Sequence, residues 1–362
     1  MKKIILFFFL ILLTNYTARA QDWILGPFVK SKSNPVVSPD SSFKFFDPVK
    51  KDSVQWQKAD VFNPAAIVMN NKVYLFTRCE DNPLAGIGGR TSRIGLCESD
   101  DGIHFKKYPF PVLFPRDDQF KKYDYPGGCE DPRIVSVNDT FFVMLYTSWN
   151  WKIARLSVAF SKDLIHWVKK GIAFLKYRNG KYKNTFTKSA SIITEFENGK
   201  LTIAKIHGKY WMYWGEHFVN LAWSDNLYDW NPVEENNELK HVMDPRPRKF
   251  DSRLAECGPP AIITKKGILL LYNGKNAANS KADHNLPKGV YSVGEALFDI
   301  NDPGKLLART DTCVLKPTQP QEISGQYSAG TTFAEGLIYF KDRWFLYYGM
   351  ADSFVGLAVT GR

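Results

Sequence analysis

Short apolar runs of strand length recur along the chain in pairs, each pair joined by a polar turn. In the first pair, the run at residues 65–68 is followed by a turn at residues 70–71 and a second run at residues 73–76. Equivalent pairs begin near residues 131, 189, 258 and 330, a spacing of about 60 to 70 residues. Short runs bounded by turn residues are typical of β-strands, and no segment has a convincing amphipathic helical pattern.

Five repeats of about four short strands predict an all-β fold, a five-bladed β-propeller. We assign residues 21–362 to this single domain. The first strand of each repeat is expected nearest the central channel, so the five starts meet at one mouth. The stretch from residue 21 to about residue 61 precedes the first repeat, and it either closes the ring or wraps around its outside.

A second repeated element follows three of the hairpins, beginning at Ser99, Ser161 and Ser224 and ending in an aromatic residue. Its third position is Asp or Asn, which suits a turn because the side chain accepts hydrogen bonds from backbone N–H groups. His104 and His166 hold equivalent positions in two copies. This equivalence favours a structural role for both histidines over catalysis.

The composition, 44% hydrophobic and 23% charged, is that of a globular protein and excludes a disordered chain or a coiled coil. The formal net charge is +11, but the charges are scattered without a long run of one sign. We therefore expect a basic solvated surface and no nucleic-acid partner.

The N-terminus predicts export. Lys2 and Lys3 precede an apolar run at residues 4–13, and Ala-Arg-Ala at residues 18–20 resembles a cleavage site. Residues 1–20 are therefore predicted to be a signal peptide, and the mature protein to be secreted or periplasmic. No Cys follows the cleavage point, so no lipid anchor is expected, and no later run is long enough to insert in a membrane.

The five cysteines lack the spacing of a zinc site, and no metal or nucleotide-binding motif is present, so we expect no metal and no cofactor. Because five is odd, we expect mostly buried thiols and at most one disulfide.

Polar residues stand where the repeats begin or where their second strands end. One polar group per blade at one mouth is the arrangement that a sugar-binding funnel requires. These residues are Asn63, Arg78, Glu80, Glu130, Asp131, Lys188, Ser189, Glu216, Glu256 and Asp352.

Several of these segments resemble glycoside hydrolase family 130, over roughly residues 60–360. The most specific is Gly-Cys-Glu-Asp-Pro-Arg-Ile at residues 128–134, accompanied by Asn-Pro-Ala at residues 63–65 and Tyr-Gly-Met-Ala-Asp-Ser at residues 348–353. The resemblance implies a five-bladed propeller that acts on β-mannosides with inversion. It also implies that Asp131 is the general acid, which protonates the glycosidic oxygen through a mannose hydroxyl.

The nucleophile is either phosphate or water. A phosphorylase holds phosphate with several cations, and the family's phosphorylases carry a His where this chain has Asn273 in Tyr-Asn-Gly. Glu216 and Glu256 resemble the carboxylates of the family's hydrolytic members, the β-1,2-mannosidases. Either residue is a candidate for the base that activates water, and export also favours hydrolysis over release of a sugar phosphate.

The remaining polar and aromatic residues are assigned to a manno-oligosaccharide or mannose-containing glycan. We expect Arg133 to brace the neighbouring carboxylates, and the glycine-rich loop at residues 86–89 to lie at the pocket rim. The predicted substrate-binding residues are Asn63, Arg78, Arg93, Trp149, Lys188, Asn273 and Asp352.

Three alternatives to a secreted β-mannosidase stay open. The first is an exported β-mannoside phosphorylase that releases mannose 1-phosphate, and the second is a non-catalytic sugar-binding propeller. The third is another five-bladed glycosidase acting on arabinan or fructan, which Asn63 disfavours because those enzymes place a carboxylate in the first blade. The linkage, the mode of attack and the oligomeric state are not determined by the sequence.

Overall fold

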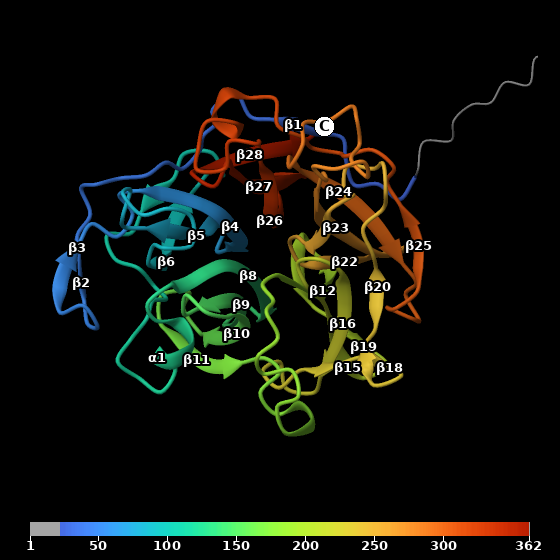
Figure 1. The fold of residues 1–362 in the computed structure, drawn as a ribbon, viewed down its shortest axis with the longest axis horizontal. Helices are drawn as coiled ribbons and strands as arrows, with labels where there is room; N and C mark the ends of the chain where they lie inside the picture. The colour runs from blue at the N-terminus through green and yellow to red at the C-terminus, as the bar shows by residue number, and fades with distance from the viewer. Residues whose placement is uncertain (1–21, 362) are drawn as a thin grey trace, which may run out of the picture.

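The structure, a computed structural model, describes residues 22–361, and in this range the chain forms five antiparallel blades arranged in a ring around one central axis (Figure 1). The predicted signal peptide, residues 1–20, lies outside the described residues. Successive blades follow one another around the ring in chain order, as the colours of Figure 1 show. The predicted all-β propeller is therefore confirmed.

Each blade begins with the strand nearest the channel. The first blade consists of β4 (Asp60–Met69), β5 (Lys72–Glu80), β6 (Ser92–Ser99) and β7 (Lys106–Lys107). The second consists of β8 (Gly128–Asn138), β9 (Phe141–Trp149), β10 (Ala154–Ser161) and β11 (Trp167–Ile172). The third consists of β12 (Ala190–Glu197), β15 (Lys209–Trp214) and β16 (Val219–Ser224), with β17 (Asn231–Pro232) and β20 (His241–Met243) outside them.

The inner strand of the fourth blade is divided, because prolines at residues 259 and 260 interrupt it between β21 (Leu254–Cys257) and β22 (Ala261–Thr264). Outside them lie β23 (Gly267–Lys275), β24 (Tyr291–Phe298) and β25 (Leu306–Arg309). The fifth blade consists of β26 (Thr332–Phe340), β27 (Arg343–Met350), β28 (Phe354–Thr360) and β1 (Phe28–Lys30). Short elements complete the fold: β2 (Phe45–Asp47), β3 (Asp52–Val54), α1 (Lys121–Asp124), β13 (Lys200–Ile203), β14 (Lys205–Ile206), β18 (Glu234–Glu235) and β19 (Glu238–Leu239).

The N-terminal strand β1 closes the ring by pairing with the C-terminal strand β28, in a register that sets Val29 opposite Val359. Pairing the last blade with the first strand leaves no open edge on β28 and joins the two ends of the chain. The hairpin of β2 and β3 lies at the periphery, beside the first blade (Figure 1). The segment before the first repeat therefore both closes the ring, through β1, and wraps around its outside, through β2 and β3.

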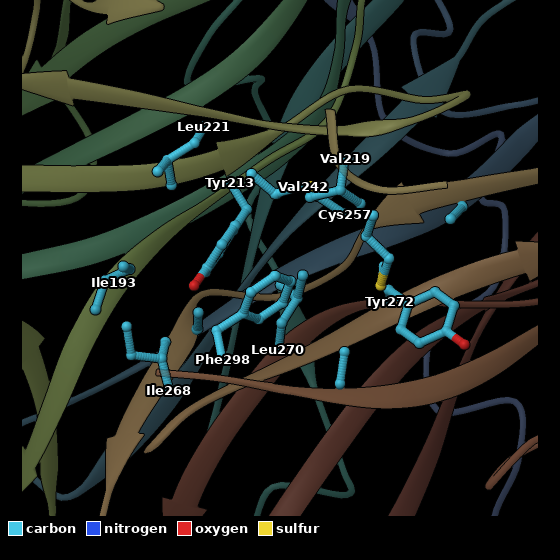
Figure 2. Packing of buried hydrophobic residues seen from close by; sticks show 14 of the residues in the cluster. Ile193, Tyr213, Val219, Leu221, Val242, Cys257, Ile268, Leu270, Tyr272 and Phe298 are labelled. Carbon is cyan, nitrogen blue, oxygen red and sulfur yellow. The ribbon is translucent and has the colours of Figure 1, made fainter. Parts of the chain in front are cut away.

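The hydrophobic core is divided among the interfaces between blades. Over the described residues, five buried clusters each join two neighbouring blades, and the fifth joins the last blade to the first. Figure 2 shows the cluster between the third and fourth blades, where Tyr213 and Leu221 face Leu270 and Phe298. The rings of Tyr213 and Phe298 lie 4.5 Å apart. A blade is thus apolar on both faces because each face packs on a neighbour.

The repeated Ser-x-Asp element forms turns at the ends of strands opposite the mouth. Asp101 accepts hydrogen bonds from the backbone N–H groups of Ile103 and His104, each at 2.8 Å. The His104 ring lies exposed, with Nδ1 2.7 Å from the same carboxylate. The second copy repeats this geometry at Asp163 and His166. The structural role predicted for both histidines is confirmed.

All five cysteines lie in the described range and are free, and four of them are buried. The prediction of mostly buried free thiols is confirmed, and no disulfide forms among these five cysteines. Within residues 22–361, no helix is long and apolar enough to cross a membrane.

Candidate active site

Bulges at one end of the channel turn side chains toward the mouth. The register of β4 shifts between Phe62 and Ala65, and that of β8 shifts between Glu130 and Arg133. Asn63 and Asp131, one in each bulge, have φ angles of 46° and 48°, in the left-handed region. A bulge redirects a side chain that would otherwise follow the alternation of the strand. Asn63 uses this to donate from Nδ2 to Asp131 Oδ1 at 2.9 Å.

Asp131 is buried among cations. Arg78 Nη1 lies 3.2 Å from Asp131 Oδ1, and Lys188 Nζ lies 3.8 Å from Oδ2. Burial by itself opposes ionisation, but the positive charges of Arg78 and Lys188 outweigh it and lower the pKa of Asp131. Asp131 is therefore a carboxylate in the free site.

Arg78 forms ion pairs with several carboxylates at the mouth. Its Nη2 lies 2.8 Å from Glu80 and 2.9 Å from Glu130, and Lys188 lies 3.3 Å from Glu130 on the other side. Burial, opposed by the positive charge of Arg78, raises the pKa of Asp352 to about 7. More carboxylates than cations thus surround Arg78 and Lys188. Because the pKa of Asp352 lies near 7, this carboxyl group gains or loses its proton near neutral pH.

Glu256 lies next to the last residue of β21 in the fourth blade and is buried. Its Oε1 accepts a hydrogen bond of 2.5 Å from Ser189 Oγ, which precedes β12 in the third blade. Burial and then the negative charge of Glu216 raise the pKa of Glu256 to about 8. Burial also raises the pKa of Glu216, with Lys188 and His217 acting in the opposite direction. The charge interactions among Glu216, Glu256, Lys188 and Asp131 indicate that the structure brings the three predicted catalytic carboxylates to one site.

Arg133 braces this site from below, as predicted. Its guanidinium donates to the backbone oxygen of Asp131 at 2.9 Å and to Ser189 Oγ at 2.8 Å. Glu335, in the bulge of β26, lies 2.9 Å from the same group. Because Ser189 Oγ accepts from Arg133, its own proton is directed to Glu256. Four blades are linked through this buried arginine.

A cavity of about 150 Å³ opens at the mouth, and its lining includes Arg78 and Lys188, the two cations that contact Asp131. One side of its lining is polar, and the other is apolar, with the Gly88 segment at the rim as predicted. The lining residues are Phe62, Arg78, Glu80, Ile87, Gly88, Glu130, Trp149, Phe186, Lys188, Gln326 and Asp352. A second cavity, of about 140 Å³, opens at the far ends of the inner strands, where its lining is mainly aliphatic.

The structure does not bring two predicted sugar ligands to the pocket. Arg93 is fully buried and bound to Asp47 at 2.5 Å and to Asp81 at 3.0 Å, so it fastens the peripheral hairpin to the first blade. Asn273 is also fully buried, where it exchanges hydrogen bonds of 3.0 and 2.8 Å with the backbone of Ala334. Both side chains are fully buried and bound to protein groups, which corrects their assignment to substrate. The other five predicted ligands lie at the mouth.

Several residues of the site were given no individual role, or were not identified at all, from the sequence. Glu80 and Glu130 stand at the predicted repeat positions, and that position was the available signal for them. Glu335 is displaced by a bulge, and Phe186 and Gln326 lie in irregular loops that carry no periodic pattern.

A five-bladed propeller with clustered carboxylates and cations at one mouth is the architecture of a carbohydrate-active enzyme. The chain belongs to glycoside hydrolase family 130: the family model, described as beta-1,4-mannooligosaccharide phosphorylase, matches residues 28–361. Members of this family act on mannosides, both as phosphorylases and as hydrolases.

Two solved structures and a curated relative are similar over most of their length. A 1,2-beta-oligomannan phosphorylase of Thermoanaerobacter sp. is 33% identical over 309 residues, which are 84% of this chain and 91% of the relative. A glycosyl hydrolase from Bacteroides ovatus is 48% identical with a TM-score of 0.92, covering 94% of this chain and 95% of that one. A third protein is 49% identical, with the same TM-score and coverage. The description of that structure reads: the GH130 family of mannoside phosphorylases contains glycoside hydrolases that target beta-1,2 mannosidic linkages in Candida mannan.

Proposed function

We propose that this protein is an exported hydrolase that cleaves β-1,2-linked manno-oligosaccharides with inversion. The observation that carries the proposal is a pair of carboxylates, the buried Glu256 and the partly buried Glu216, which interact through their charges with each other and with Lys188. A phosphate dianion would be repelled at this position, whereas a water molecule would find a proton acceptor. The solved structures that are 48 and 49% identical, and described in terms of hydrolysis, support this choice.

The cations near the pair do not suit phosphate either. Lys188 is paired with Glu130 at 3.3 Å, and Arg133 is paired with Glu335 at 2.9 Å. Within the described residues, the charge of each of these cations is thus already balanced by a buried carboxylate. Phosphate could bind to either cation only if its ion pair were broken, which would leave a buried carboxylate without its partner.

Asp131 acts as the acid in this proposal, although it is a carboxylate in the free site. A bound sugar displaces water from the pocket and takes hydrogen bonds from Arg78 and Lys188, and both changes raise the pKa of Asp131. The acid then delivers its proton to the leaving oxygen through a hydroxyl of the bound mannose. Glu256 or Glu216 removes a proton from the water that attacks the opposite face of the ring.

Product analysis by NMR tests the proposal. The protein without residues 1–20 is incubated with β-1,2-mannobiose, with and without inorganic phosphate. Free α-mannose as the first product in both tubes is the expected result. The curated relatives described as phosphorylases support the competing outcome, in which mannose 1-phosphate forms only with phosphate, and that result would overturn the proposal.

The catalytic base is tested separately. Glu216→Gln and Glu256→Gln should each lower the hydrolytic rate, and full activity in both variants would show that neither residue is the base.

A further inference from the structure

The pocket is small for the substrate class proposed above. Its volume, about 150 Å³, lies below the range of roughly 300–1,000 Å³ of typical ligand pockets. The polar side of the lining thus suits one sugar ring. In a longer oligosaccharide, the remaining rings must lie outside, against whatever forms the rim.

The rim is apolar and exposed beside the polar pocket. We use the term aromatic rim for Trp149, Trp151 and Phe186 together with the aliphatic Ile87. Trp149 is the last residue of β9, Trp151 lies in the turn that follows it, and Phe186 and Ile87 come from two loops around the mouth. The side chains of Ile87, Trp151 and Phe186 are 64%, 49% and 51% exposed. Trp149 and Phe186 pack edge to face with their rings 6.2 Å apart, and both line the pocket. Large exposed aromatic side chains beside a binding pocket are typical of an interaction surface.

The two tryptophans are fixed by the polar edges of their rings. Trp149 Nε1 donates to the backbone oxygen of Gly88 at 3.0 Å, and Trp151 Nε1 donates to that of Arg90 at 3.4 Å. Arg90 is itself held by an ion pair of 3.1 Å with the buried Glu80. The only N–H group of each indole is thus hydrogen-bonded to the protein, and only the apolar ring is available to a ligand. A surface held in this way loses little conformational entropy on binding.

We propose that the aromatic rim is the binding surface for the leaving part of the oligosaccharide, an inference that rests on the proposed function. Phe186, which lines the pocket, stacks on the first sugar beyond the scissile bond. Trp151, outside the pocket lining, stacks on the next sugar. The C–H groups on one face of a pyranose are apolar and match an aromatic ring that has no free donor. The rim thereby selects chains of three or more sugars over the disaccharide.

The test compares β-1,2-mannobiose with β-1,2-mannotriose for the wild type and for Trp151→Ala, with phosphate present so that either reaction is recorded. Loss of one aromatic stack should lower kcat/KM for the trisaccharide by about 10-fold. The rate on the disaccharide should change by less than about twofold, since the disaccharide has no second leaving sugar. Phe186→Ala should lower kcat/KM for both substrates, mainly through KM.

Two further variants separate stacking from general disruption. Trp151→Phe keeps an aromatic face but loses the N–H group, and it should retain the preference for the trisaccharide. Phe196→Ala removes an aromatic side chain that is 36% exposed at the far end of β12. It should leave kcat/KM unchanged for both the disaccharide and the trisaccharide. Thermal melting confirms that each variant is folded.

Wild-type turnover of both sugars with an unchanged preference in Trp151→Ala would overturn this inference alone. No turnover of either sugar by the wild type would reject the proposed function, and the inference with it.

Discussion

Removing the Ser189 hydroxyl should shift the pH dependence of the reaction. Ser189 Oγ donates to Glu256 Oε1 at 2.5 Å and accepts from Arg133 at 2.8 Å, so its proton is directed to the carboxylate. This bond favours the ionised form of Glu256 against burial and against the charge of Glu216, which together hold its pKa at about 8. Ser189→Ala therefore raises the pKa of Glu256 further.

The size of the change follows from the strength of the bond. A hydrogen bond to a charged group contributes about 1.5–3 kcal/mol, and 1.36 kcal/mol corresponds to one pKa unit. If Glu256 is the base, it acts only as a carboxylate, so activity is lost as pH falls through its pKa. The acidic limb of kcat/KM should then move up by about 1 to 2 pH units, and activity at pH 7 should fall about 10- to 100-fold.

The assay is the pH profile of kcat/KM on β-1,2-mannobiose from pH 5 to pH 10, which reports ionisations of the free enzyme. Ser191→Ala is the matched control: Ser191 is equally buried two residues along the same segment, but it donates to the backbone oxygen of Gly258. Its profile should keep the wild-type limb. An acidic limb that stays in place in Ser189→Ala, or moves to lower pH, would show that Glu256 is not the base and would leave Glu216 as the candidate.

The remaining predictions concern the acid, the buried brace and the closure of the ring. Asp131→Asn should lower kcat by about 10²- to 10⁴-fold because a general acid is lost, and near-wild-type turnover would exclude that role. Arg133→Met leaves Glu335 buried without its partner, so urea unfolding should show a loss of about 3–5 kcal/mol, whereas a loss below 1 kcal/mol would show that the pair is not a brace. Ser31→Pro removes the backbone hydrogen bond of 2.8 Å from Ser31 to Leu357 beside β1, so the free energy of unfolding should fall by about 1–3 kcal/mol. Ser31→Ala keeps that bond, and an equal loss in the alanine variant would contradict the account of closure.

The repeat pattern and the family motifs were sufficient for the fold and for much of the site. Paired apolar runs joined by polar turns identified the repeats. The polar residues at their starts included Asp131 and Glu256, and the family resemblance gave these two residues their predicted roles. These assignments depend on position along the chain, which a local pattern records.

The tertiary structure decided which of those polar residues reach the channel. Arg78 and Arg93 both lie on strands of the first blade, yet Arg78 holds Asp131 whereas Arg93 is taken up by Asp47 and Asp81. The difference arises because a peripheral hairpin packs beside Arg93, a contact between segments that no local pattern encodes. Phe186 and Glu335 were missed for a related reason: a loop has no period, and a bulge shifts the alternation by one residue. The sequence alone therefore determined the repeats and the polar residues at their starts, and the packing of the blades and loops decided what each residue touches.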